Sequence, residues 1–223
     1  MDERPRLSQF LKPRRAGEVL LLTLVCWALS SPGLLWLWEN ASVERQPPAA
    51  LLQLSAMLLL LCWAIHRFWG VRWGGPELLP HGSVRGAAIL SGILLLVVTW
   101  QFFTKDLVLV EAGVFPRPEP RSVLWLVFYA VAFSEVVIRV GWTSLAAGLT
   151  RRPGRAVAVA ALCISLMEQS SLQVPGAMSS AWWASVYLSS LARECLLGIV
   201  AYRHGVLIAM ALHALYTLRW LLV

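Results

Sequence analysis

Long apolar runs fill most of this chain, and short segments rich in proline, glycine and arginine separate them. Hydrophobic residues make up 58% of the 223 residues and charged residues only 14%, whereas soluble domains average about 45–50% and about 25%. So few charged side chains cannot cover a soluble fold of this size. We therefore predict an all-α, polytopic transmembrane helical bundle embedded in a lipid bilayer. The spans of such a bundle use almost the whole chain, so no room is left for a separate nucleic-acid-binding domain, Rossmann enzyme or kinase.

A helix needs about 20 apolar residues to cross a bilayer, so roughly six to eight spans fit this length. We predict seven, namely Gly17–Trp38, Ala49–Trp69, Ala87–Phe103, Ser122–Thr150, Ala156–Leu172, Ala181–Tyr202 and Val206–Leu222. The first run continues past Pro32 and is too long for the apolar part of a signal peptide, so we expect an uncleaved, proline-kinked span. Leu107–Phe115 is short, and we expect it to be interfacial or a partial eighth element.

Basic residues are shared unequally between the two sets of loops. If the N-terminus is inside, the inner segments hold twelve: Arg4, Arg6, Lys12, Arg14, Arg15, Arg67, Arg72, Arg85, Arg151, Arg152, Arg155 and Arg203. The outer loops hold four: Arg45, Lys105, Arg117 and Arg121. This bias predicts a multi-pass protein of the inner (cytoplasmic) membrane with a cytoplasmic N-terminal segment, residues 1–16. It also explains the net charge of +7 without a nucleic-acid partner.

Ionisable residues inside the apolar runs are the best pointers to function, because charge is expensive in lipid. Glu135 and Arg139 are spaced i, i+4, so they share a helical face and can pair. Ser134 precedes Glu135 and lies about 100° around the helix, where it could line the same cavity. The alternative is a purely structural ion pair.

Three further spans contribute polar groups at a similar depth. Glu168 stands in the fifth span, before a polar stretch, and could instead lie at its outer mouth. Arg193 and Glu194 are adjacent in the sixth span and face different directions. One could pair with a neighbouring helix, and we treat both as structural by default. His213 stands in the last span with Thr217 one turn later on the same face. Polar groups at one level of four helices are expected of an enclosed site.

These segments resemble the CPBP family of intramembrane proteases (the CAAX proteases and bacteriocin-processing enzymes of the Abi group). That family carries Glu-Glu-x-x-x-Arg, then Phe-x-x-x-His, then His-x-x-x-Asn or His-x-x-x-Asp on successive late spans. The matching segments here are Ser134-Glu135-x-x-x-Arg139, Ile164-x-x-x-Glu168 and His213-x-x-x-Thr217. The resemblance covers residues 122–223, which we treat as a CPBP-like core preceded by N-terminal transmembrane helices in residues 17–121.

The resemblance implies cleavage of a membrane-anchored or lipidated peptide by a glutamate-activated water, without a cofactor. In the family, the first Glu and the second-motif His activate the water, whereas this chain has Ser134 and Glu168 there. If the roles are redistributed, Glu168 activates water, His213 stabilises the oxyanion, and Thr217 assists. Glu135 and Arg139 complete that catalytic set.

Other functions remain open. The substitutions at the motif positions also fit a catalytically inactive homologue that acts as a binding, immunity or scaffold protein. A small transporter subunit is a third hypothesis, although no repeat halves are visible. A metal site is not expected, because only one deep histidine is present and the four cysteines lie singly in apolar runs.

Overall fold

The structure is a computed structural model that describes residues 13–40, 47–68, 70, 74–80, 82–113, 119–170 and 178–222. Within these ranges the chain is mostly helical and contains no strand, which confirms the predicted all-α fold class. Seven continuous helical stretches follow one another along the described chain. Parts of four predicted elements lie outside these ranges: residues 1–12 of the basic segment, the ends of two spans at Trp69 and at residues 171–172, and residues 114 and 115.

Most of the described helical stretches are regular α-helix, but two of them contain wider π-helical turns. The elements in order are α1 Pro13–Asn40, α2 Pro48–Phe68, α3 Val84–Gln101, α4 Leu107–Glu111, α5 Pro120–Tyr129, α6 Thr143–Thr150, α7 Pro153–Ser170, α8 Ser180–His204 and α9 Val206–Thr217. A π turn at Phe102–Asp106 joins α3 to α4, and π turns at Ala130–Ser134 and Val136–Trp142 join α5 to α6. A 3-10 turn, Leu218–Leu222, ends α9.

The seven predicted spans each correspond to one of these helical stretches. Five are long and apolar enough to cross a membrane: Gly17–Glu39, Pro48–Phe68, Val84–Glu111, Pro120–Thr150 and Ser180–His204. The last helix, Val206–Leu222, is apolar but shorter, and α7 is not among the five. The expectation of a separate element at Leu107–Phe115 was wrong, because Leu107–Glu111 continues the third helix through its π turn.

Local sequence signals set several helix ends. Ser83 caps α3 by accepting a hydrogen bond from the Gly86 amide, and Ser179 caps α8 in the same way. Pro120 stands in the first turn of α5, where a missing N–H does no harm. Gly205 separates α8 from α9. Its φ of +95° is a backbone conformation that residues other than glycine rarely adopt.

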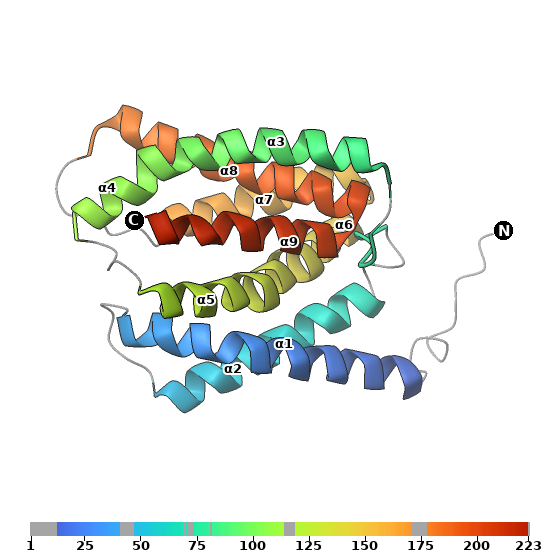
Figure 1. Cartoon of the computed structure of the whole chain (residues 1–223). Helices are drawn as coiled ribbons and strands as arrows, with labels where there is room; N and C mark the ends of the chain where they lie inside the picture. Colours follow the sequence, from blue (N-terminus) through green and yellow to red (C-terminus); the bar gives the residue numbers. More distant parts are fainter. Residues whose placement is uncertain are drawn as a thin grey trace.

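The bundle has α1 and α2 on one side and α3 and α8 on the other, with α9 and the α5–α6 helix between them (Figure 1). Its main core lies where α2, α5–α6, α8 and α9 meet; representative members are Leu59, Val136, Val140, Val200 and Val206, all fully buried. The start of α1 and the end of the last helix lie at opposite ends of the bundle (Figure 1).

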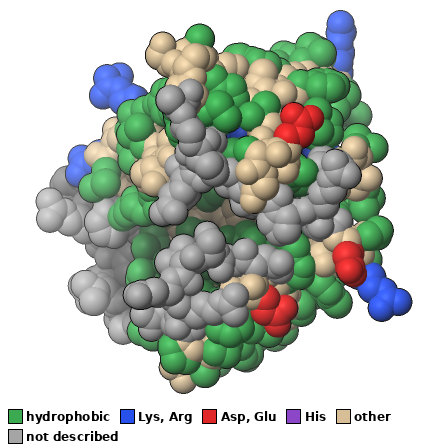
Figure 2. All heavy atoms as spheres, turned by 90° about the vertical axis from the view of Figure 1, so that its left-hand side faces the viewer, with side chains coloured by type: hydrophobic (Ala, Val, Ile, Leu, Met, Phe, Trp, Pro, Cys, Tyr) green, Lys and Arg blue, Asp and Glu red, His purple; other side chains and the backbone are tan. Residues whose placement is uncertain are grey.

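Leucines and other large apolar side chains cover much of the outside of the bundle. Leu96 is 72% exposed, and Leu95 and Leu215 are similarly open. Figure 2 shows the end of the bundle near the C-terminus, where hydrophobic side chains form most of the described surface and charged side chains stand apart. Exposed leucines along the sides of the helices fit lipid rather than water, and five of the helices are long enough to cross a membrane. The chain is therefore a polytopic membrane protein.

A close contact between α1 and α5 gives a test of this packing. A Cβ atom on Gly33 would overlap the Trp125 carbonyl oxygen and would lie 2.6 Å from the Tyr129 Cβ, whereas Gly92 has open space around it. We expect Gly33→Ala to destabilise the protein by about 1–3 kcal/mol, because the helices must separate. Gly92→Ala should be neutral or stabilising by up to about 1 kcal/mol. Denaturant unfolding in mixed micelles measures both, and equal effects would contradict the packing described.

Candidate functional site

A buried network of charged and polar side chains runs through the centre of the bundle. Five helical stretches supply it: α3–α4, α5–α6, α7, α8 and α9. In order of contact, its members are His213, Glu135, Arg139, Glu194, Arg193, Glu168 and Lys105.

One end of the network is the contact between Glu135 and His213. The Nδ1 atom of His213 lies 2.7 Å from Oε1 of Glu135, and the glutamate is completely buried. Arg139 donates from Nε to the other carboxylate oxygen at 3.2 Å, so the predicted i, i+4 pair is present. Glu135 stands between two π turns, a feature often seen at functional sites.

The centre of the network is Glu194, which holds two guanidinium groups. Arg139 donates from Nη2 to Oε2 of Glu194 at 2.6 Å and from Nη1 to its backbone carbonyl at 3.2 Å. Arg193 donates from Nε to Oε1 of Glu194 at 2.9 Å. The two residues project apart on α8, but the long Arg193 side chain turns back to Glu194. Each also pairs with another helix, as one alternative predicted, Glu194 through Arg139 and Arg193 through Glu168.

The other end of the network is Glu168, whose two carboxylate oxygens each accept from a cation. Lys105 donates to Oε1, and Arg193 donates to Oε2 at 2.7 Å. The assignment of Lys105 to an outer loop was wrong, because it lies in the π turn of the third helix and is only 5% exposed. Glu168 contacts neither Glu135 nor His213 directly.

Charge balance explains how this network exists inside an apolar bundle. Three carboxylates, Glu135, Glu168 and Glu194, are matched by three cations, Lys105, Arg139 and Arg193. The set is neutral when the His213 imidazole is neutral. A buried ion pair is tolerated only when every charge has a partner and further hydrogen bonds satisfy it.

The remaining predicted residues take lesser parts. Thr217 donates its hydroxyl hydrogen to the His213 backbone carbonyl at 2.9 Å, so that hydrogen is engaged away from the imidazole. Ser134 is partly buried at the end of a π turn. The structure therefore brings Glu135, Arg139 and His213 into direct contact, and joins Glu168 to them only through Arg193 and Glu194.

Three residues of the site were missed from the sequence, namely Gln101, Tyr216 and Lys105, and so was the central position of Glu194. Arg193 donates from Nη1 to Gln101 Oε1 at 3.2 Å and to the Tyr216 hydroxyl at 3.0 Å. Lys105 was placed in an outer loop, although the apolar residues Leu107–Val110 follow it after Asp106. That apolar continuation is the one signal that could have placed Lys105 inside the helix.

An apolar groove of about 740 Å³ lies beside the network, between the α3 helix and the last helix. Leu94, Val98, Phe102 and Leu215 are among its walls, together with Tyr216. The Tyr216 ring lies 5.3 Å from the His213 ring, centroid to centroid. The groove thus reaches a residue that contacts both the histidine and Arg193.

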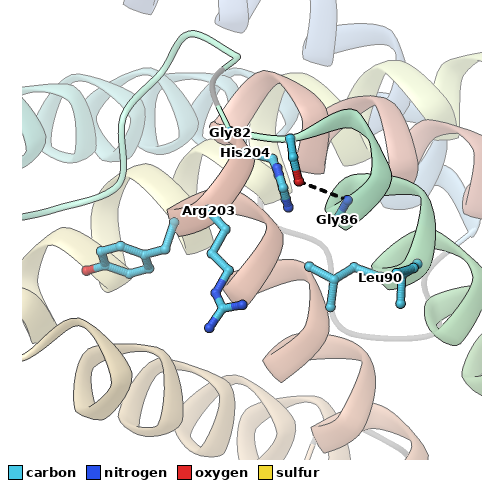
Figure 3. A pocket seen from close by; sticks show the side chains of 8 residues that line it. Gly82, Gly86, Leu90, Arg203 and His204 are labelled. Atoms are coloured by element: carbon cyan, nitrogen blue, oxygen red, sulfur yellow. Dashed lines mark hydrogen bonds between the residues drawn. The ribbon is translucent and has the colours of Figure 1, made fainter.

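A second cavity, of about 590 Å³, lies where α3 begins and α8 ends (Figure 3). Gly82 and Gly86 lie beside the His204 ring, and Arg203 and Leu90 also line the space (Figure 3). None of the residues predicted for the site lines this cavity. Among the described residues, no group of three or more His, Cys, Asp or Glu side chains is placed to hold a metal ion.

No family model matches this chain, and no curated protein or solved structure matches it. The resemblance to the CPBP proteases therefore remains a prediction that rests on three short motifs.

The charge balance of the network can be tested by comparing the stability of variants that remove one or two of its charges. Arg139→Met leaves Glu135 and Glu194 short of a cation, and losing one partner of a buried pair costs about 3–5 kcal/mol. Adding Glu194→Gln restores neutrality, so the double variant should unfold at a higher denaturant concentration than Arg139→Met alone. Arg155→Met, at the exposed start of α7, should stay within about 0.5 kcal/mol of wild type. A double variant that is less stable than Arg139→Met would refute the balance.

Proposed function

We propose that this protein is an intramembrane hydrolase of membrane-anchored peptides, in which His213, oriented by Glu135, activates a water molecule. The observation that carries the proposal is the 2.7 Å contact between His213 Nδ1 and Glu135 Oε1 in a fully buried setting. A carboxylate at this position favours the tautomer with the proton on Nδ1. The Nε2 lone pair is then free to accept a proton from water, as in other histidine general bases.

Two further features support His213 as the base. No described residue forms a hydrogen bond with Nε2, and 11% of the side chain stays accessible. None of the cations of the network bonds to Oε1 of Glu135, so that oxygen is left to orient the imidazole. Glu168, the base expected from the motif comparison, is less suited, because two cations occupy its carboxylate oxygens.

The apolar groove supports a substrate with a hydrocarbon or transmembrane anchor. Its walls are leucine, valine and phenylalanine side chains, which favour apolar ligands. An anchor lying in the groove would be close to Tyr216 and thereby to His213. The substrate class is therefore a peptide that is held in the bilayer, as the family resemblance implies.

A non-catalytic binding protein of the same fold is the second candidate. It is favoured by a specific observation: neither cavity described above is lined by Glu135 or His213. A transporter is less favoured, because the guanidinium groups of Arg139 and Arg193 interrupt the network, and arginine does not release a proton to pass it on.

Peptide cleavage tests the proposal directly. Wild type and His213→Ala are each reconstituted with single-span membrane proteins from the producing cells, and new peptide termini are counted by mass spectrometry. We expect termini that depend on the wild type and fall by at least about 10²-fold in His213→Ala, because the base is lost. Arg155→Gln, an exposed change, serves as the control and should cleave normally.

The hydrolase proposal fails if His213→Ala and wild type yield the same termini. Equal binding of an anchored peptide by both proteins, without any cleavage, would favour the binding-protein candidate instead.

We also propose that the protein lies in the inner membrane with its N-terminus in the cytoplasm. The end of the bundle that holds Arg151, Arg152 and Arg203 would then face the cytoplasm, as the positive-inside rule predicts. Single cysteines at Arg152 and at Glu111, in a background without the four native cysteines, can be labelled on intact spheroplasts with an impermeant maleimide. We expect labelling at position 111 only, and labelling at position 152 only would reverse the orientation.

A further inference from the structure

Glu194 lies at the centre of the network, between Arg139 and Arg193, yet no motif points to it. It lies in the middle of α8, is 1% exposed, and uses both carboxylate oxygens for different guanidinium groups. Arg139 is bound to it twice, once at the carboxylate and once at the backbone carbonyl. Glu194 thus determines where the Arg139 guanidinium lies.

We propose that Glu194 is a positioning residue that holds the Glu135–His213 pair in its productive geometry through Arg139. The expected effect of Glu194 on catalysis rests on the proposed function, whereas its expected effect on the position of the His213 proton does not. The guanidinium is a planar, rigid fork. With Nη1 and Nη2 bound by Glu194, only Nε of Arg139 reaches Glu135, and it reaches only Oε2.

The free oxygen is what His213 requires. Since Arg139 occupies Oε2 alone, Oε1 of Glu135 accepts from Nδ1 of His213. Without the Glu194 carboxylate, Arg139 can turn and take both oxygens of Glu135 in a bidentate pair, which is the geometry that guanidinium and carboxylate groups prefer. His213 would then share Oε1 with the guanidinium, and its proton would be held less firmly at Nδ1.

A purely structural role for Glu194 predicts something different. In that case its replacement lowers stability but leaves the His213 tautomer unchanged in the molecules that stay folded. The nitrogen signals of the histidine ring therefore separate the two roles, because they report the site of the proton and not the stability of the fold.

The experiment compares ¹⁵N spectra of histidine-labelled protein in lipid nanodiscs for wild type, Glu194→Gln and Glu111→Gln. His213 is assigned from the signal missing in His213→Gln. We expect the Nδ1-protonated, neutral form in wild type and in Glu111→Gln, whose carboxylate is exposed at the end of α4. Glu194→Gln should show a mixture of tautomers or the Nε2-protonated form, and kcat for peptide cleavage should fall about 10²-fold with KM nearly unchanged.

Glu194→Asp keeps the network neutral and covers the case in which Glu194→Gln does not fold. Its carboxylate is one methylene shorter and draws back from Arg139, so the His213 signals should again move. Wild-type signals for His213 in a folded Glu194 variant would overturn the positioning role. A moved signal in a protein that cleaves no peptide would instead retain the positioning role and reject the hydrolase proposal.

Discussion

The exclusion of unpaired charge from an apolar interior is the constraint on which this structure depends. Three carboxylates and three cations lie among helices whose outer faces are leucine-rich, and each charge is in contact with an opposite one. In such surroundings a single unmatched charge costs several kcal/mol. The network therefore requires particular positions of α3–α4, α5–α6, α7 and α8 relative to one another. The apolar packing fills the space that these contacts leave.

The same constraint links the fold to the proposed chemistry. The network fixes the buried Glu135 carboxylate, and this carboxylate directs the His213 proton to Nδ1. The wide π turns on both sides of Glu135 and the π turn that carries Lys105 present these side chains to the centre of the bundle. Regular helix at these points would rotate the charged groups away from their partners, because each π turn changes the spacing of side chains around the helix.

Apolar run length was sufficient to predict the helices, but the site was only partly predictable. The Glu135–Arg139 pair follows from local i, i+4 spacing, which a single helix determines. The contact between Glu135 and His213 joins residues 78 positions apart, and only the tertiary packing determines it. Lys105 was misplaced because a charge usually ends a span, whereas here Glu168 on another helix neutralises it. Arg193 and Glu194 project apart as neighbours on a helix, yet the long arginine side chain turns back to its neighbour.

The contact between Glu135 and His213 is the central claim, and a direct distance measurement tests it. Solid-state NMR can record dipolar recoupling between ¹³Cδ of glutamate and ring ¹⁵N of histidine in lipid-embedded protein, with His213→Gln as the blank. The structure predicts strong dephasing of the Nδ1 signal of His213, in keeping with the 2.7 Å approach of Nδ1 to the carboxylate oxygen. A His213 signal that is not dephased by any glutamate carboxyl carbon would contradict the account.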